Sequence, residues 1–444
     1  MPYLHSLVSS PPLGWNSFDC YNASVTEAEV KANAQVLARR LAPYGWEYVV
    51  VDFCWSHPSP KLDINPNLEA LPDGTLEPLL AIDALARLLP APNRFPSSAG
   101  GAGFKPLGDF IHGLGLKFGI HIMRGIPRQA VQQNLPIAGG WHAADIANPA
   151  DSCTWLNQMY GVDMSKPGAQ AYYDSLFELY AGWGVDYVKV DDISHPYHAA
   201  EIEAVAHAIA ACGRPIVLSL SPGPAPLAAA EHLRQHANLW RISADFWDDW
   251  TQLKKQFALC AAWTKYIAPH HWPDGDMLPL GQLSVRGPQA RPRQTHFTRA
   301  EQFALMSLFA IFRNPLMVGA DLPTSDEFTF ALLTNPEVLA IHQHSQNTRL
   351  LFLDDDSAAW MADAPDSADR YLALFNLSDA GRAVAVSLAA LGFSTAVRMR
   401  DLWQQTDLPT PVTQTFAPIL PAHGGSLYRV TPLQPSSKEG TFDF

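Results

Sequence analysis

The chain has 444 residues, 48% of them hydrophobic and 16% charged, which is enough apolar sequence for a large core and argues against global disorder. Its formal net charge of -13 argues against nucleic acid and anionic membranes as main partners. The five cysteines form no disulfide framework, the N-terminus has no basic n-region, and no window approaches the roughly 20 apolar residues of a membrane span. The sequence therefore predicts a soluble, cytoplasmic protein.

Eight strand-like apolar runs alternate with helical patterns along the first 345 residues. Such alternation predicts parallel strands, and eight strands are the number that closes a (β/α)8 TIM barrel. The doubly wound alternative is weaker, because no GxGxxG turn follows the first run. The runs lie at 11–18, 47–53, 117–122, 186–191, 215–220, 239–243, 265–269 and 315–320.

The clearest helical pattern covers 26–41. Thr26 and Glu29 have the spacing of a capping box, in which each side chain satisfies a backbone N–H group of the other residue. The apolar positions that follow share one face, as in a helix that packs on a sheet. They are Val30, Ala34, Leu37 and Leu41.

The pattern changes near residue 345. Short alternating stretches, separated by turn residues, predict a small antiparallel β-sandwich. These stretches lie at 349–353, 371–376, 382–388, 396–401 and 426–430. We therefore expect a barrel over 1–345, a β-sandwich over 346–433 and a polar tail over 434–444.

Polar and aromatic residues gather at the carboxyl ends of the predicted barrel strands, where such barrels hold their active sites. Carboxylates and guanidinium groups hydrogen-bond in bidentate fashion, and the apolar face of a sugar ring stacks on an indole. A neutral, hydroxyl-rich ligand fits such a rim. The residues are Trp15, Asp52, His121, Arg124, Lys189, Asp191, Ser219, Ser221, Arg241, Asp245, Trp272, Asp274 and Asp276.

Several chemistries are compatible with this rim. Two carboxylates on opposite sides of a bond describe glycoside hydrolysis. Metal binding competes, but the His and Asp residues lack close ligand spacing, and Lys189 and Arg241 would oppose a cation. We therefore expect no metal and no cofactor. A barrel that binds sugar without catalysis is the remaining alternative.

Five segments resemble motifs of glycoside hydrolase family 27, the α-galactosidase or melibiase family. The motifs stand in the family's order over about 1–345, and the C-terminal β region is similar to the family's appended sandwich. The likeness is to a bacterial-type member. The segments are PPLGWNSFDC at 11–20, VVDFCW at 50–55, WGVDYVKVDD at 183–192, WRISAD at 240–245 and WPDGDML at 272–278.

The resemblance implies roles for individual residues. The KxD of the fourth strand matches the nucleophile motif, so Asp191 is the expected nucleophile. The RxxxD of WRISAD matches the acid/base motif, so Asp245 is the expected proton donor. Family members retain anomeric configuration through a covalent glycosyl-enzyme. The residues expected to line the sugar subsite are Trp15, Asp52, Lys189, Arg241 and Asp276.

Elementary chemistry agrees with these roles. A nucleophilic carboxylate must be ionised, and Lys189 would hold the pKa of Asp191 low. An acid must be protonated, and Trp247 with other apolar neighbours would favour that form of Asp245. A retaining pair needs carboxyl groups about 5–5.5 Å apart. We expect the adjacent Asp192 to cap or brace the next helix.

The sequence departs from the family pattern after the second strand. Many α-galactosidases have two adjacent Asp residues there, which grip O4 and O6 of galactose. Here the pair is Asp52 and Phe53, and Phe53 cannot hydrogen-bond a hydroxymethyl group. β-L-Arabinopyranose is galactose without that hydroxymethyl group, so Phe53 suits a β-L-arabinopyranosidase, an activity also found in the family.

Two further departures concern the third and fifth strands. Ser221 and Gly223 leave room near C2 of the sugar, where an N-acetyl group would fit, unless the whole loop is remodelled. His121 stands where an aromatic residue is common and either contacts sugar or is a rim histidine, while Arg124 binds substrate or pairs with a rim Asp. Cys20 and Cys54 lie near strand ends, but free thiols are expected in a cytoplasmic chain.

We therefore expect a retaining exo-glycosidase that removes terminal α-D-galactosyl units, with β-L-arabinopyranosidase as the alternative. An α-N-acetylgalactosaminidase and an isomaltodextran-cleaving enzyme are weaker possibilities. The expected partner is an oligosaccharide or small glycoside, with no role for nucleic acid or membrane. The natural substrate and the oligomeric state do not follow from the sequence.

Overall fold

The computed structural model describes residues 7–59, 67–287 and 291–433. Two compact units divide the chain: the first comprises Met1–Asp248, Ala268–His296 and Pro315–Thr334, and the second comprises Asp249–Ile267, Phe297–Asn314 and Asn335–Phe444. The domain ranges 1–345 and 346–433 stay predictions, and the tail 434–444 lies outside the described residues.

The first unit contains an eight-stranded parallel sheet in the order β12-β11-β10-β9-β5-β2-β1-β15. A parallel bridge between Leu278 and Val318 joins the segment after β12 to β15, which completes the ring. The predicted TIM barrel is thereby confirmed. Its strands are β1 (Leu13–Asn16), β2 (Tyr48–Val51), β5 (Lys117–Met123), β9 (Tyr187–Asp191), β10 (Val217–Leu220), β11 (Leu239–Arg241), β12 (Trp272–Asp274) and β15 (Leu316–Val318).

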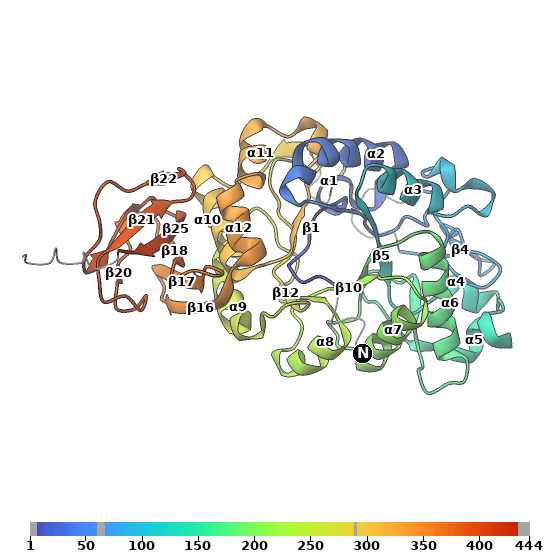
Figure 1. Cartoon of the computed structure of the whole chain (residues 1–444). Coiled ribbons are helices and arrows are strands. Elements are labelled where there is room, and N and C mark those ends of the chain that lie inside the picture. Colours follow the sequence, from blue (N-terminus) through green and yellow to red (C-terminus); the bar gives the residue numbers. More distant parts are fainter. Residues whose placement is uncertain (1–6, 60–66, 288–290, 434–444) are drawn as a thin grey trace, which may run out of the picture. The chain divides into compact units, whose positions relative to one another are not determined.

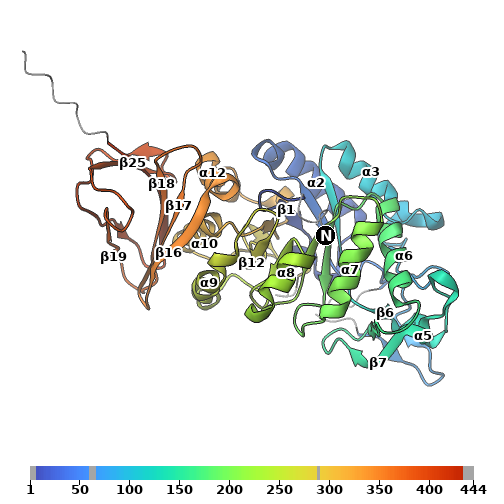
Figure 2. The same ribbon diagram turned by 60° about the horizontal axis from the view of Figure 1, so that its bottom comes forward.

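The helices of the first unit follow the strands in the alternation that the sequence predicts. Figure 1 and Figure 2 show the longest two, α6 and α7, side by side on the outside of the barrel. The helices are α1 (Phe18–Tyr21), α2 (Glu27–Val36), α3 (Lys105–Gly113), α4 (Arg128–Gln132), α5 (Ala143–Ile146), α6 (Ala169–Gly182), α7 (Ala199–Ala211), α8 (Ala230–His236) and α11 (Glu327–Leu333).

Local sequence explains the start of α2. The capping box of Thr26 and Glu29 is present, with the Thr26 backbone N–H donating to Glu29 at 2.9 Å. The apolar face continues past the end of α2 into a π-helical turn over Leu37–Leu41. All four predicted face residues, Val30, Ala34, Leu37 and Leu41, are completely buried. The predicted helix is therefore confirmed, together with its capping and its buried face.

The predicted position of the seventh strand is wrong. The apolar run 265–269 begins within a 3₁₀ turn, Thr264–Tyr266, that follows helix α9 (Trp250–Trp263). The Tyr266 ring packs on Trp263 with ring centroids 5.4 Å apart, so these apolar residues complete a helix end. The strand itself is β12, seven residues further on.

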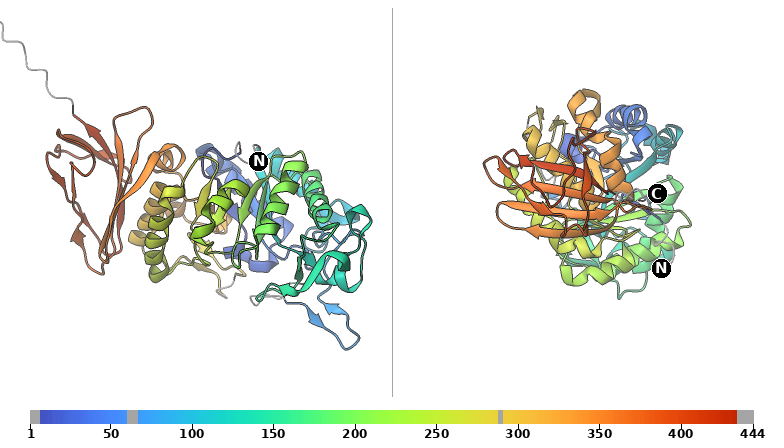
Figure 3. Two further views of the ribbon diagram at one scale, coloured as in Figure 1. Left: turned by 90° about the horizontal axis from the view of Figure 1, so that it is seen from below. Right: turned by 60° about the vertical axis from the view of Figure 1, so that its left-hand side comes forward.

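Short strands extend the loops at the rim of the barrel. The hairpin of β3 (Glu69–Ala70) and β4 (Leu76–Glu77) projects from the first unit, as the left view of Figure 3 shows in blue. A three-stranded sheet contains β6 (Ile126–Pro127), β8 (Met159–Val162) and β7 (Ala147–Ser152). A further pair is β13 (Gln282–Leu283) with β14 (Arg293–Gln294).

The second unit combines three helices with the predicted antiparallel β-sandwich. The helices are α9, α10 (Arg299–Phe312) and α12 (Pro336–His344). The main sheet has the order β16 (Gln346–Leu353), β17 (Ser357–Asp363), β18 (Arg370–Asn376), β25 (Gly425–Pro432), β21 (Val397–Asp401) and β22 (Thr406–Asp407). The smaller pairs are β19 (Arg382–Ala383) with β24 (Ile419–Leu420), and β20 (Val386–Ser387) with β23 (Thr415–Phe416).

Candidate active site

A cavity of about 580 Å³ opens at the carboxyl ends of the barrel strands. This volume lies in the range of small-molecule sites. The lining combines aromatic rings with carboxylates and two cations. The lining residues are Phe18, Asp19, Asn22, Asp52, Phe53, Trp155, Lys189, Asp191, Pro222, Gly223, Arg241, Ala244, Asp245, Phe246, Trp247, Asp276 and Met277.

Asp191 ends strand β9 and lies at the floor of this cavity, only 8% exposed. His121 Nε2 lies 2.9 Å from Asp191 Oδ2, and the backbone N–H of Asp192 donates to Oδ1 at 2.8 Å. Burial alone would raise the pKa of Asp191, but the His121 hydrogen bond and the charge of Lys189 hold that pKa below its usual value. The carboxyl group is therefore kept ionised, as a nucleophile requires.

Asp52 and Lys189 form the next polar group of the cavity. Lys189 Nζ lies 3.1 Å from Asp52 Oδ2, which also accepts a hydrogen bond from Asn16 at 2.8 Å. Burial favours the neutral acid, yet Lys189 and the other partners lower the pKa of Asp52 to about 2. Burial likewise opposes the charge of Lys189, but Asp52, Asp191 and Asp276 raise its pKa. Both groups stay charged and offer hydrogen bonds of opposite polarity to a ligand.

Arg241 organises the opposite side of the cavity. Its Nη2 lies 2.8 Å from Asp276 Oδ2 and 3.3 Å from Asp245 Oδ1, and its buried Nε has no hydrogen-bond partner. The pKa of Asp276 lies above its usual value, chiefly because the carboxyl group is buried. The charge of Asp245 also raises this pKa, and the charge of Arg241 lowers it without cancelling the effect of burial. Asp245 has a side chain that is 62% exposed. The apolar enclosure expected around Asp245 is therefore absent from its described surroundings, and its carboxyl group is an accessible part of the cavity lining.

An aromatic wall borders the carboxylates. Phe53 is 4% exposed, with its ring centroid 5.4 Å from that of Phe18 and 5.9 Å from that of His121. Phe18 also lies beneath the Lys189 ammonium, 5.8 Å from ring centroid to Nζ. Because Phe53 follows Asp52 directly, the chain places an acceptor and an apolar surface next to each other at one end of the cavity.

Comparison with known proteins identifies the family of this chain. The alpha galactosidase A family model matches residues 158–344, and the alpha galactosidase C-terminal beta sandwich model matches 354–430. The crystal structure of a GH27 β-L-arabinopyranosidase from Geobacillus stearothermophilus is 48% identical, with a TM-score of 0.92, and the match covers 98% of this chain and 99% of that one. This chain belongs to glycoside hydrolase family 27.

Two other relatives lie at different distances from this family 27 enzyme. A candidate α-N-acetylgalactosaminidase from Bacillus halodurans is 45% identical with a TM-score of 0.84, covering 96% of this chain and 98% of that one. Alpha-galactosidase 2 of Arabidopsis thaliana is 25% identical, covering 96% of this chain and 91% of its own length. A second structure of the Geobacillus enzyme, a variant, is a complex with arabinose. The chain is thus a glycosidase of the α-galactosidase type.

Most residues that the sequence assigned to catalysis or to sugar binding line the cavity of this glycosidase, and Trp15, His121 and Ser221 lie behind the lining. Those in the lining are Asp52, Phe53, Lys189, Asp191, Arg241, Asp245 and Asp276. Trp15 is completely buried and donates its indole N–H to the Ala320 carbonyl at 2.7 Å. His121 is 2% exposed and reaches the cavity through Asp191. Ser221 is 2% exposed, beside the lining residues Pro222 and Gly223. Direct contact of these three residues with sugar stays a prediction.

Sequence reasoning missed several residues that line the cavity. Asp19 lies within the GWNSFDC motif, four residues beyond Trp15, but it does not stand at the end of a predicted strand. Trp155 comes from the loop between β7 and β8, far from any barrel strand in sequence. Met277 follows Asp276 directly within WPDGDML. Of these three residues, Asp19 and Met277 carried a usable signal, namely membership of a motif, and Trp155 carried none.

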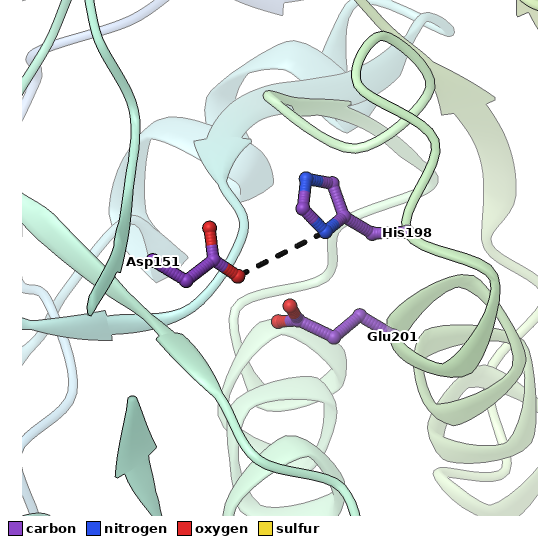
Figure 4. A group of neighbouring side chains, drawn as sticks. All are labelled: Asp151, His198 and Glu201. Atoms are coloured by element: carbon purple, nitrogen blue, oxygen red, sulfur yellow. Dashed lines mark ion pairs between the residues drawn. The ribbon is translucent and has the colours of Figure 1, made fainter. Parts of the chain in front are cut away.

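Arg124, whose role the sequence left open, pairs with acidic residues. Figure 4 shows Asp151, His198 and Glu201, whose potential ligand atoms lie within 4.8 Å of one another. Arg124 donates to both oxygens of Asp151, at 2.9 and 2.7 Å, and to Glu201 at 2.8 Å. A guanidinium at the centre of this group repels a cation, so the group is a buried ion-pair network.

The same arginine also contacts Asp192, the residue that follows Asp191. Arg124 Nε donates to the Asp192 carbonyl at 2.6 Å, and its Nη2 lies 3.0 Å from Asp192 Oδ2. Asp192 has a φ of 56°, a left-handed conformation that few non-glycine residues adopt. Since α7 begins only at Ala199, Asp192 braces the loop after β9 instead of capping that helix.

The five cysteines, Cys20, Cys54, Cys153, Cys212 and Cys260, are free thiols. Cys20 Sγ donates to the Gln282 carbonyl at 3.2 Å, and Cys54 Sγ accepts from Gln158 at 3.6 Å. Burial raises the pKa of the Cys54 thiol to about 12, which makes it a poor nucleophile. The expectation of free thiols agrees with these contacts.

Replacing His121 tests its support of Asp191. His121→Ala removes a hydrogen bond that lowers the pKa of Asp191, so the acid limb of the pH profile of kcat/KM should move to higher pH. At neutral pH we expect a loss of about tenfold, the usual value of one such bond. His121→Gln keeps a donor at a similar reach and should restore the acid limb. An unchanged acid limb in His121→Ala would contradict this role.

Proposed function

We propose that this family 27 enzyme is a retaining exo-glycosidase that prefers terminal β-L-arabinopyranosyl units and accepts terminal α-D-galactosyl units less well. The observation that carries the preference is Phe53, buried in the cavity beside Asp52 and packed on Phe18. The 48% identity to a β-L-arabinopyranosidase, against 25% to a plant α-galactosidase, supports the same order.

The proposed chemistry uses Asp191 and Asp245 in two displacements. In the first, an Asp191 oxygen attacks the anomeric carbon while Asp245 gives its proton to the departing glycosidic oxygen, and a covalent glycosyl ester forms. In the second, Asp245 takes a proton from water, the hydroxide attacks the same carbon, and Asp191 leaves as carboxylate. Two inversions give net retention, which NMR of the first-formed sugar anomer would reveal.

The preference for arabinopyranose follows from the chemistry of one substituent. Asp52 can accept a hydrogen bond from a ring hydroxyl, as can any carboxylate at its position. Galactose adds a hydroxymethyl group, which would have to displace or contact the Phe53 ring and would find no hydrogen-bond partner on it. An arabinopyranose ring carries only hydrogen at that carbon, and an apolar wall suits it.

An α-N-acetylgalactosaminidase is the second candidate, because of the Bacillus halodurans relative and the small residues after β10. The structure assigns Gly223 a packing role there. A Cβ on Gly223 would lie 2.1 Å from the Ser243 carbonyl oxygen. Glycine is therefore needed here because the backbone after β11 packs directly against it. Packing against Ser243 therefore accounts for the glycine at this position without a larger sugar substituent, which weakens this candidate.

The proposal is tested by measuring kcat/KM side by side on p-nitrophenyl β-L-arabinopyranoside, α-D-galactopyranoside and N-acetyl-α-D-galactosaminide. We expect the first substrate to exceed the second by about 10- to 200-fold, the usual discrimination by one small apolar contact. We expect the third to be inert. Preference for the galactoside would overturn the arabinopyranosidase assignment and leave the retaining mechanism intact.

Phe53→Asp should reverse part of this preference. The new carboxylate restores the paired acceptors of galactose-specific relatives and removes the ring that faces the hydroxymethyl group. We expect the ratio of galactoside to arabinoside kcat/KM to rise about 10- to 200-fold. Phe53→Leu, which keeps an apolar wall, is the matched control and should hold the ratio near its original value. An unchanged ratio in Phe53→Asp would mean that Phe53 does not face this end of the sugar.

We also propose that the enzyme acts in the cytoplasm on imported oligosaccharides or small glycosides. The free thiols at Cys20 and Cys54, each hydrogen-bonded within the first unit, support a reducing compartment. Among the described residues, no helix combines the length and apolar character that crossing a bilayer requires.

A further inference from the structure

The short helix α1 places a carboxyl group in the cavity that the proposed mechanism does not use. Asp19 follows strand β1, lines the cavity and is only 3% exposed. Its backbone carbonyl accepts a hydrogen bond from Ser284 at 3.0 Å, which fixes the chain at this point. The residue is thus held in place at the border of the cavity.

One oxygen of this carboxyl group is enclosed by protein. Asp19 Oδ2 is buried and has no hydrogen-bond partner. It packs on Gly319, just beyond β15, where an added Cβ would lie 2.1 Å from it. Oδ2 is therefore sealed against the barrel wall, and Oδ1 is the atom through which Asp19 can reach a ligand.

The other carboxyl groups of the cavity have partners that Asp19 lacks. Asp52 accepts from Asn16 and Lys189, and Asp191 accepts from the Asp192 backbone. Within the described residues neither oxygen of the Asp19 carboxyl group has a hydrogen-bond partner, and Oδ2 is sealed by Gly319. Polar groups of native proteins are normally satisfied, so Oδ1, the oxygen that is not sealed, is left for a partner that arrives with the ligand.

The charge around Asp19 favours its neutral form. Burial is the main cause that raises the pKa of Asp19 well above its usual range, and Asp276, Asp52 and Asp245 act in the same direction against Lys189. A neutral carboxylic acid carries an O–H donor, in addition to the N–H donors that line the cavity on Lys189, Arg241 and Asn22. A donor of this kind fits the oxygen of a sugar hydroxyl.

We propose that Asp19 is a further sugar-binding residue, whose carboxyl group donates a hydrogen bond to one ring hydroxyl of the glycosyl unit held in the cavity. This inference rests on the proposed function, since it assigns a contact within the same site. The contact comes from the segment that follows β1. It is separate from the proposed catalytic carboxyl groups, Asp191 and Asp245, and from the Asp52–Lys189 pair.

The test couples variants of Asp19 to changes in the substrate. Asp19→Ala and Asp19→Asn are assayed on the preferred p-nitrophenyl glycoside and on its 2-, 3- and 4-deoxy analogues. Asp19→Ala should lower kcat/KM on the parent about tenfold, and this effect should vanish for the one analogue that lacks the contacted hydroxyl. Asp19→Asn keeps an N–H donor and should stay within about threefold of the original enzyme.

A structural role would produce a different pattern. Ser284→Ala is the matched control, since it lies against the same backbone but not in the cavity lining, and it should leave every ratio unchanged. Equal losses by Asp19→Ala on all three analogues, or no loss on the parent, would overturn the proposal. If Asp19→Ala does not fold, a loss in Asp19→Asn that is equal across the analogues overturns it.

Binding of free sugar separates this proposal from the proposed function. If the unaltered enzyme hydrolyses none of the glycosides, the proposed function fails. Calorimetric titration of L-arabinose and D-galactose into the unaltered protein and into Asp19→Ala still measures the contact. About tenfold weaker binding of the better sugar by Asp19→Ala supports the contact, and equal binding overturns it.

Discussion

Asp191→Gly should lower kcat on aryl glycosides by roughly four to six powers of ten, as loss of a catalytic nucleophile does elsewhere. The expectation rests on geometry and charge together. Asp191 lies in the cavity at the end of β9, and the His121 hydrogen bond, Lys189 and the Asp192 amide keep its pKa low despite burial. Glycine leaves a space beneath the anomeric carbon and removes the atom that attacks it.

Azide identifies the missing group. In Asp191→Gly, azide fits the vacated space and attacks the anomeric carbon once, so activity should partly return and the product should be a glycosyl azide of inverted configuration. Asp186→Asn is the matched control, because Asp186 precedes the same strand at the opposite end of the barrel, where it pairs with His112 and Arg214. The control should keep near-normal kcat. A folded Asp191→Gly enzyme with near-normal activity would refute the nucleophile assignment.

The barrel could be predicted from sequence because each of its signals is local. Buried parallel strands read as short apolar runs, and the capping box of Thr26 and Glu29 marks a helix start within four residues. The seventh strand was misplaced for the same reason. The run 265–269 is apolar because Tyr266 completes the packing at the end of α9. An apolar pattern of only a few residues does not distinguish a buried strand from a packed helix end.

The sequence could predict those site residues that stand at the ends of barrel strands. Asp52, Lys189, Asp191 and Arg241 stand on barrel strands or directly after them, so parallel register alone brings their side chains together. The open question about Arg124 depended on residues from three other segments, Asp151, Asp192 and Glu201, which meet only in the folded chain. No spacing in the sequence encodes that network.

Asp19 and Gly319 illustrate a further limit. Membership of a motif marks Asp19 in the sequence but does not reveal its contact with Gly319. That contact joins the segments that follow β1 and β15, the first and last barrel strands along the chain. The enclosure of the Asp19 carboxyl group depends on barrel closure and on the lack of a side chain at Gly319. Similarly, the sequence could not show that the position of a side chain at residue 223 is filled by the Ser243 backbone, which lies close only in the folded chain.

Asp245→Ala should have an effect that depends on the leaving group. Asp245 is the exposed carboxyl group of the cavity mouth, 3.3 Å from Arg241, and its proton is needed only where the departing oxygen is basic. With an alkyl or sugar leaving group we expect kcat/KM to fall by about 10²- to 10⁴-fold, the usual contribution of general acid catalysis. With p-nitrophenolate, which leaves without a proton, kcat/KM should fall far less.

Hydrolysis of the glycosyl-enzyme separates the acid/base role from a merely structural one. Without Asp245 no base activates water, so the ester of Asp191 should accumulate on aryl substrates and lower KM together with kcat. Azide needs no base, and it should restore turnover and yield a glycosyl azide of retained configuration, the opposite of the Asp191→Gly product. Asp249→Asn, which keeps an N-cap residue at the start of α9, is the control and should behave as the original enzyme. Equal losses for alkyl and aryl substrates, without rescue by azide, would mean that another group supplies the proton.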